Sequence, residues 1–198
     1  MKVLRIIVEY LGSLIGSAQE VTTDEENAVL SLVLQWKFED GGYTVVDPKT
    51  RLRNYDLSDT NEIAQAKQYI RTNIAIAEHD VSALVDQLFQ KNAKAATLTL
   101  PSAPGNGYLI DKDGHFQEYF QKKYFLKDGG GWGRWYKDNP KAHGLTKVSR
   151  PVIDEANGLV LVYRGTQVHL LVGSGWIILY EYKDGKLKEL KRAMLWVS

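Results

Sequence analysis

The sequence contains no cysteine. Disulfide bonds are therefore excluded, as are thiolate metal ligands and thiolate nucleophiles. An excess of charge of one sign is also lacking, because 25 Lys and Arg residues stand against 24 Asp and Glu residues, for a formal net charge of +1. Proteins that bind nucleic acid through its phosphates usually carry an excess of positive charge, so we expect no nucleic-acid partner. For the compartment we expect the cytoplasm, with secretion or a periplasmic location as the alternative.

Metal and cofactor motifs are lacking as well. No two of the four histidines have the His-x-x-x-His spacing of a helical zinc site; they are His79, His115, His143 and His169. Asp111, Asp113 and Gly114 resemble part of a calcium loop. With Gly114 in the sixth position, however, the first and twelfth positions would be Leu109 and Phe120, which cannot bind calcium. The segment therefore predicts a turn, and we expect no metal ion and no cofactor.

The segment Gly173-Ser174-Gly175 lacks the frame of a catalytic or phosphate-binding loop. A nucleophile elbow needs Gly-x-Ser-x-Gly, and a dinucleotide-binding loop needs Gly-x-Gly-x-x-Gly. Neither motif is present here. Glycines within a strand usually mark a bulge or a close approach of the backbone to another group. The sequence therefore predicts a structural role for Gly173 and Gly175.

No apolar run is long enough and free enough of charge to span a bilayer. The longest candidate, residues 3–15, is interrupted by Arg5 and Glu9, and its polar residues recur at helical spacing. This pattern predicts an amphipathic helix docked on the protein. Two alternatives stay open: a signal peptide cleaved near Gly16–Ala18, and a helix that contacts a membrane surface.

The composition is that of a folded protein, with 44% hydrophobic and 25% charged residues. We expect one domain, residues 1–198, with a helical part at 1–128 and a sheet part at 129–198. Thr23 and Glu26 form a capping-box pattern, which predicts a helix that ends at Gly41-Gly42. Further helices are predicted to begin at Asp59 or Thr60 and after Asp80.

Beyond the glycines at 129–131 the hydrophobic period changes to two, which is typical of strands. Four strands are predicted, joined by short turns that include Gly165-Thr166; the strands are Leu145–Ile153, Gly158–Arg164, Val168–Tyr182 and Lys186–Val197. Consecutive strands with short connections pair antiparallel. The predicted fold class is therefore α+β, with the N-terminal helices packed on one face of a C-terminal four-stranded antiparallel β-meander.

Aromatic residues cluster directly after the three glycines. Trp132, Trp135 and Tyr136 offer a large contact area, and His143 follows within the same predicted loop. A loop beside flexible glycines can border a functional surface. It can equally fold onto the sheet as a hydrophobic lid.

Four further residues are candidates for binding. Arg150 can clamp a carboxylate or phosphate, or it can form a salt bridge with Glu181 on a neighbouring strand. A pocket between sheet and helices would be lined by Arg150, Tyr163, His169 and Trp176. Two hypotheses follow: a non-catalytic binding or protein-interaction domain that uses the aromatic loop and one sheet face, and a small-molecule, hydrolase-like enzyme. We favour the first, because no nucleophile, base and orienting group can be assembled from the spacing. The expected partner is an unidentified protein or small molecule.

The last third of the chain carries a series of short sequence features. They are Trp135, Asn139-Pro140, Gly144, Ser149-Arg150, Leu161-Val162-Tyr163, Gly173-Ser174-Gly175-Trp176, Gly185-Lys186 and Trp196-Val197-Ser198. In this order they resemble an uncharacterised family of bacterial proteins, which the start of the helix at Glu25 also resembles. Members often carry a Cys pair before the Gly-Ser-Gly, where this chain has Val168 and Val172. The resemblance implies one fold unit and no known activity. The strand-rich end is also faintly similar to the NTF2-like fold.

Overall fold

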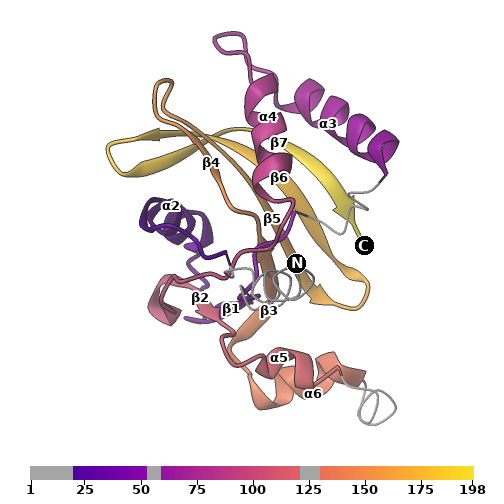
Figure 1. Cartoon of the computed structure of the whole chain (residues 1–198). Helices are drawn as coiled ribbons and strands as arrows, with labels where there is room; N and C mark the ends of the chain where they lie inside the picture. The colour runs from indigo at the N-terminus through magenta and orange to yellow at the C-terminus, as the bar shows by residue number, and fades with distance from the viewer. Residues whose placement is uncertain (1–19, 53–58, 121–129) are drawn as a thin grey trace, which may run out of the picture.

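The computed structural model describes residues 20–52, 59–120 and 130–198. The helix predicted over residues 3–15 lies outside these residues, as does Gly129. The described part contains five α-helices, a short 3-10 turn and one sheet (Figure 1). The helices are α2 (Asp24–Leu34), α3 (Thr60–Ile74), α4 (Ser82–Lys91), α5 (His115–Glu118) and α6 (Gly130–Asp138). None of the helices described is long and apolar enough to cross a membrane.

The sheet has seven strands and is mixed. Its strands are β1 (Tyr43–Val46), β2 (Tyr108–Ile110), β3 (Ala142–Val148), β4 (Val152–Asp154), β5 (Leu159–His169), β6 (Val172–Lys183) and β7 (Lys186–Val197). Their order is β2-β1-β3-β5-β6-β7, and β4 pairs with β5 outside this path. β1 lies parallel to both β2 and β3, whereas the other pairs are antiparallel. The sheet is thus larger than the predicted meander, because β1 and β2 extend it with parallel strands.

The helix starts follow the sequence closely. Thr23 accepts a hydrogen bond from the backbone N–H of Glu26, and Glu26 accepts one from the N–H of Thr23, so the predicted capping box is present. Asp59 caps α3 through the N–H groups of Asn61 and Glu62. Asp80 accepts from the N–H of Ser82 at the start of α4. The end of α2 was predicted too late, because the helix stops at Leu34 and not at Gly41-Gly42.

Helices cover both faces of the sheet, not one face as predicted (Figure 1). Alternate residues of a strand point to opposite faces. Leu159 and Leu161 of β5 accordingly pack with α3 and α4, while Val160 and Val162 pack with α2. The central strands β5 and β6 are therefore buried on both sides.

Two strand boundaries differ from the prediction. The predicted strand Leu145–Ile153 is divided into β3 and β4, because Pro151 has no backbone N–H to donate. Ser149 bridges the break: its hydroxyl oxygen accepts from the N–H of Tyr163 at 2.9 Å. The turn predicted at Gly165-Thr166 is wrong, because β5 continues to His169 and the chain reverses at Leu170-Leu171.

The predicted aromatic loop is also wrong in its local structure, because residues 130–138 form helix α6. Helices α5 and α6 pack on β1 and β3. Phe116 of α5 and Trp132 and Trp135 of α6 lie in one buried cluster with Leu145 of β3. Gly131 is required there, since a Cβ atom would meet the carbonyl oxygen of Tyr119 and the ring of Phe120. Leu145 packs with α5 and α6, and Tyr163 packs with α3 and α4. Leu145 is paired with Gln167, four residues from Tyr163 on β5, so both side chains point to the same face of the sheet. The two helix pairs therefore cover the same face.

Candidate functional site

A hollow of about 430 Å³ lies on this sheet face, between the α3–α4 pair and the α5–α6 pair. Its floor is a row of directly paired positions: Lys147 of β3 faces Gly165 of β5, Gly165 faces Gly175 of β6, and Gly175 faces Trp196 of β7. Two neighbouring strands therefore contribute no side chain at this level. We call this hollow the sheet pocket; its lining residues are Arg51, Leu145, Lys147, Tyr163, Gly165, Gln167, Trp196 and Ser198.

Two aromatic rings lie over the glycine floor and shape the sheet pocket. A Cβ atom on Gly175 would collide with the indole of Trp196, and one on Gly165 would collide with the hydroxyl of Tyr163. The indole N–H of Trp196 donates to the Tyr163 hydroxyl oxygen at 2.9 Å, which fixes the two rings relative to each other. The close approach predicted at Gly175 is confirmed, and the strand pairing also shifts register between Gly175 and Trp176.

Two cationic side chains stand at the β3 side of the sheet pocket. Lys147 projects from β3, and the backbone N–H of Arg51 donates to the carbonyl of Val148 at 2.7 Å, which holds Arg51 beside the end of that strand. Within residues 20–52, 59–120 and 130–198, Arg51 has one long ion pair, 3.7 Å from its Nε to a carboxylate oxygen of Asp47. None of the described residues that line the sheet pocket is Asp or Glu. The pocket thus combines positive charge with a flat aromatic wall.

Gly175→Val is expected to lower the free energy of unfolding by about 2 kcal/mol, because the new side chain must displace the Trp196 indole from the floor. Thermal melting followed by circular dichroism measures the effect. Gly105→Val is the matched control, since a Cβ atom there meets nothing within 4 Å. Equal melting temperatures for wild type and Gly175→Val would contradict the close approach of Trp196.

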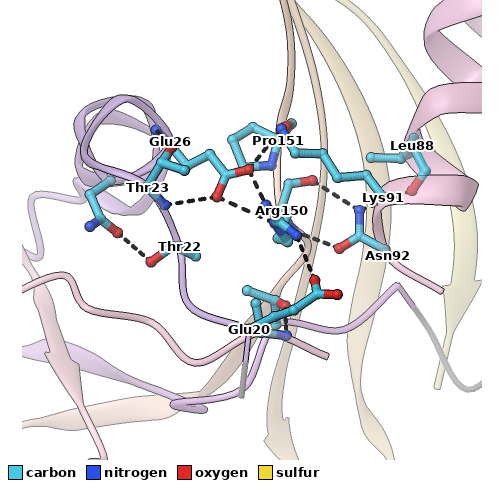
Figure 2. A network of polar contacts seen from close by, with 12 residues as sticks. Glu20, Thr22, Thr23, Glu26, Leu88, Lys91, Asn92, Arg150 and Pro151 are labelled. Carbon is cyan, nitrogen blue, oxygen red and sulfur yellow. Dashed lines mark hydrogen bonds and ion pairs between the residues drawn. The ribbon is translucent and has the colours of Figure 1, made fainter. Parts of the chain in front are cut away.

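Arg150 does not line the sheet pocket. It belongs to an ion cluster that joins α2, the end of α4 and the break after β3 (Figure 2). Its Nε lies 3.1 Å from a carboxylate oxygen of Glu26, and its Nη1 lies 2.8 Å from Glu20. The alternative salt bridge between Arg150 and Glu181 is not formed. Glu181 pairs with Lys188 instead.

Glu26 is the centre of this ion cluster, and its side chain is only 2% exposed. Lys91 Nζ lies 2.7 Å from one of its carboxylate oxygens and also donates to the carbonyl of Pro151. Burial acts to raise the pKa of Glu26, but the hydrogen bonds from Lys91 and from the Thr23 N–H, together with the Arg150 charge, outweigh it and lower the pKa. Glu26 is therefore held as a carboxylate, and Arg150 serves to neutralise it.

The aromatic residues of α6 pack inward. Trp132 and Trp135 are 7% and 4% exposed, and both meet the ring of Phe116 edge-on at about 5 Å. The Tyr136 hydroxyl donates to the carbonyl of Val168. His169 is exposed at the end of β5, with its ring 6.4 Å from that of Trp132. The structure thus brings four of the predicted residues together, at a place separate from the sheet pocket.

The two remaining candidates lie apart from both places. His143 stacks on Phe38 at 4.2 Å and contacts Asp40 at 2.8 Å. The N–H of Gly42 and the His143 ring lower the pKa of Asp40. Trp176 lies on the opposite sheet face, where its indole N–H donates to Ser174 and the Arg192 guanidinium covers its ring.

Among the predicted site residues, Tyr163 alone lines the sheet pocket. Sequence reasoning missed the others that build it, chiefly Arg51, Lys147, Gly165 and Trp196. The turn alone would not have found them. A hairpin that turns at Leu170-Leu171 pairs His169 with Val172, and only the register shift between Gln167 and His169 places Gly165 opposite Gly175.

No protein-family model, curated protein or solved structure matches this chain. The resemblance of residues 132–198 to an uncharacterised bacterial family therefore stays a prediction.

Proposed function

We propose that this protein is a non-catalytic binding domain that holds a small, flat organic anion in the sheet pocket. The single observation that carries the proposal is the glycine floor between Lys147 and Trp196. Natural strands seldom place two glycines side by side, because each weakens the sheet and leaves apolar packing unused. Here the two glycines make room for the Trp196 indole and the Tyr163 hydroxyl, which lie over them, and Lys147 stands beside Gly165 on β3.

The charge and the shape of the sheet pocket favour the same class of ligand. A carboxylate or phosphate group would lie between Lys147 and Arg51, where no acidic side chain of the described lining competes for it. A flat apolar body would lie against Trp196, Tyr163 and Leu145. Gln167 adds an amide that can donate one further hydrogen bond.

These residues favour binding over the hydrolase-like alternative. Hydrolysis by a hydroxyl nucleophile needs an adjacent general base, most often a His or a carboxylate. The described lining holds hydroxyl groups on Tyr163 and Ser198 but no His, Asp or Glu. The expectation of a binding surface on one sheet face is therefore kept, while the aromatic part of that surface moves from α6 to Trp196 and Tyr163.

Lys147→Met is expected to weaken the binding of benzoate about tenfold, because one charge-assisted contact of about 1.4 kcal/mol is lost while the aliphatic stem is kept. Isothermal titration calorimetry measures the affinity. Lys141→Met is the control, since Lys141 carries the same charge just before β3 and does not line the sheet pocket. Benzamide, which has the shape of benzoate without its charge, should bind at least tenfold more weakly to the wild type.

Benzoate binding that is unchanged in Lys147→Met would contradict the proposal. Benzamide binding as tightly as benzoate would show that the pocket recognises shape alone, which also contradicts it. A lower affinity in 200 mM than in 20 mM salt is expected, since exposed charges are screened over about 10 Å at 0.1 M salt.

A further inference from the structure

A second hollow, of about 310 Å³, lies between the β1–β2 edge of the sheet and helices α5 and α6. We call it the edge cleft. Its lining differs from that of the sheet pocket, because aromatic rings and carboxylates meet there. The aromatic rings belong to Tyr43, Tyr119 and Trp135, and the carboxylates to Asp111 and Asp113.

Three aromatic residues line the edge cleft. Tyr119 and Trp135 meet at nearly a right angle, with their centroids 5.1 Å apart and their planes 86° apart. Tyr43 adds a third ring from β1, the strand next to the edge strand β2. The face of an aromatic ring carries partial negative charge and attracts a cation placed over it.

Asp111 supplies a carboxylate at the floor of the edge cleft. It is 8% exposed, and one of its oxygens accepts from the N–H of Phe116 at 3.0 Å. This bond and a second one from the backbone N–H of His115 lie at the start of α5. Burial raises the pKa of Asp111 and outweighs the two backbone hydrogen bonds that lower it. A cation in the cleft would offset the cost of keeping this carboxylate charged.

The indole N–H of Trp135 is a second, independent observation. This nitrogen is buried, and it has no hydrogen-bond partner in the part of the chain that the structure describes. A buried donor without a partner destabilises the fold, so natural proteins rarely leave one without reason. Trp135 is also one of the residues that line the edge cleft.

We propose that the edge cleft binds a small organic ammonium ion that also carries a hydrogen-bond acceptor. The ammonium group lies among the three rings beside Asp111, and the acceptor oxygen takes the N–H of Trp135. Two cationic groups also border the cleft. Lys112 is exposed, and the His115 ring contacts the carboxylate of Glu118, at the other end of α5, at 3.4 Å. This second site is separate from the anion pocket and does not depend on it.

Choline and ethanolamine are suitable probes, because each joins an ammonium group to a hydroxyl oxygen. The neutral isostere of choline, 3,3-dimethylbutan-1-ol, is the matched control ligand. Binding to the full chain is measured by ligand-observed NMR. At least one ammonium probe should bind in a saturable way, and the neutral isostere should bind about tenfold more weakly than choline.

Two variants of the edge cleft and one control variant sharpen the test. Asp111→Asn keeps an oxygen to accept from Phe116 and should weaken ammonium binding about tenfold. Glu155→Gln removes a carboxylate away from the edge cleft and should leave binding unchanged. Trp135→Phe keeps a ring but removes the N–H. It should weaken binding about fivefold. Because the smaller ring leaves space among buried neighbours, binding is measured under conditions in which circular dichroism shows that the variant is folded.

Three results would overturn the proposal. The first is the absence of saturable binding by both ammonium probes. The second is equal binding of choline and its neutral isostere, a result that does not depend on any variant folding. The third is unchanged binding in Trp135→Phe. None of these results bears on benzoate binding in the sheet pocket, so the two proposals fail separately.

Discussion

Replacement of both Trp132 and Trp135 by alanine is expected to lower the free energy of unfolding by more than about 4 kcal/mol. A buried aromatic side chain truncated to alanine costs about 3–5 kcal/mol, and the two rings share Phe116 as a neighbour, so their effects will not simply add. A loss of this size is a large part of the stability of a typical domain. Urea unfolding followed by circular dichroism measures it.

Trp36→Ala is the control for this pair, because the Trp36 side chain is 53% exposed. Its effect should stay within about 1 kcal/mol. A double variant of Trp132 and Trp135 that melts like the wild type would contradict the inward packing of α6. It would also restore the expectation that these rings border a functional surface.

The second large effect is expected at Glu26. Glu26→Gln keeps an oxygen for the Thr23 N–H but removes the charge that Arg150 and Lys91 share. Removal of one partner from a buried ion pair costs about 3–5 kcal/mol, because the remaining charges are left without compensation. We expect about 3 kcal/mol, since Arg150 and Lys91 are partly exposed. Glu20→Gln, at the exposed rim of the ion cluster, should cost less than about 1 kcal/mol.

The same carboxylate gives the stability a dependence on pH. The pKa of Glu26 is lower in the folded protein than its ordinary value of 4.5. Its contribution is therefore fully present above that value and is lost as the pH falls through the folded-state pKa. Other carboxylates titrate in the same range, so the difference between wild type and Glu26→Gln is the quantity to follow. This difference should shrink below pH 4.5. A difference that stays constant from pH 7 to pH 3 would contradict the assigned ion cluster.

Local features of the fold could be predicted from the sequence. The caps at Thr23 and Asp59 depend on side chains within three residues of the backbone groups they bind, so their spacing is visible in the sequence. The turn at Asp184-Gly185 also follows ordinary turn chemistry, with a positive φ at both residues. The period of two predicted beyond residues 129–131 correctly indicated strands, although α6 comes first and the strands begin at Ala142.

The turn between β5 and β6 could not be predicted in this way. Leu170 and Leu171 occupy it with 58% and 74% of their surface exposed, against the usual preference for Asn, Asp or Gly. Gly165-Thr166 looked like the better turn, and this choice hid the glycine floor. The error propagated, because the position of a hairpin turn sets the register of both strands.

Contacts between distant parts of the chain could not be predicted from local sequence patterns. Glu26 and Arg150 are 124 residues apart in sequence, and the closer candidate, Glu181, was the natural choice. Two parallel pairings, β1 with β2 and β1 with β3, likewise depend on long connections that periodicity does not fix. The candidate sites combine such contacts, so neither the sheet pocket nor the edge cleft could be assembled from the sequence.

The most direct test of the proposed binding role is NMR of the tryptophan indoles during a benzoate titration. The chain has five tryptophans, and each gives an indole N–H signal that selective substitution can assign. The account predicts that the Trp196 signal, with the amide signals of Gly165 and Gly175, shifts in a saturable way. The signals of Trp36 and Trp176, which do not line the sheet pocket, should stay fixed. Shifts confined to other tryptophans, or no saturable shift of Trp196, would contradict the proposal that the sheet pocket binds an organic anion.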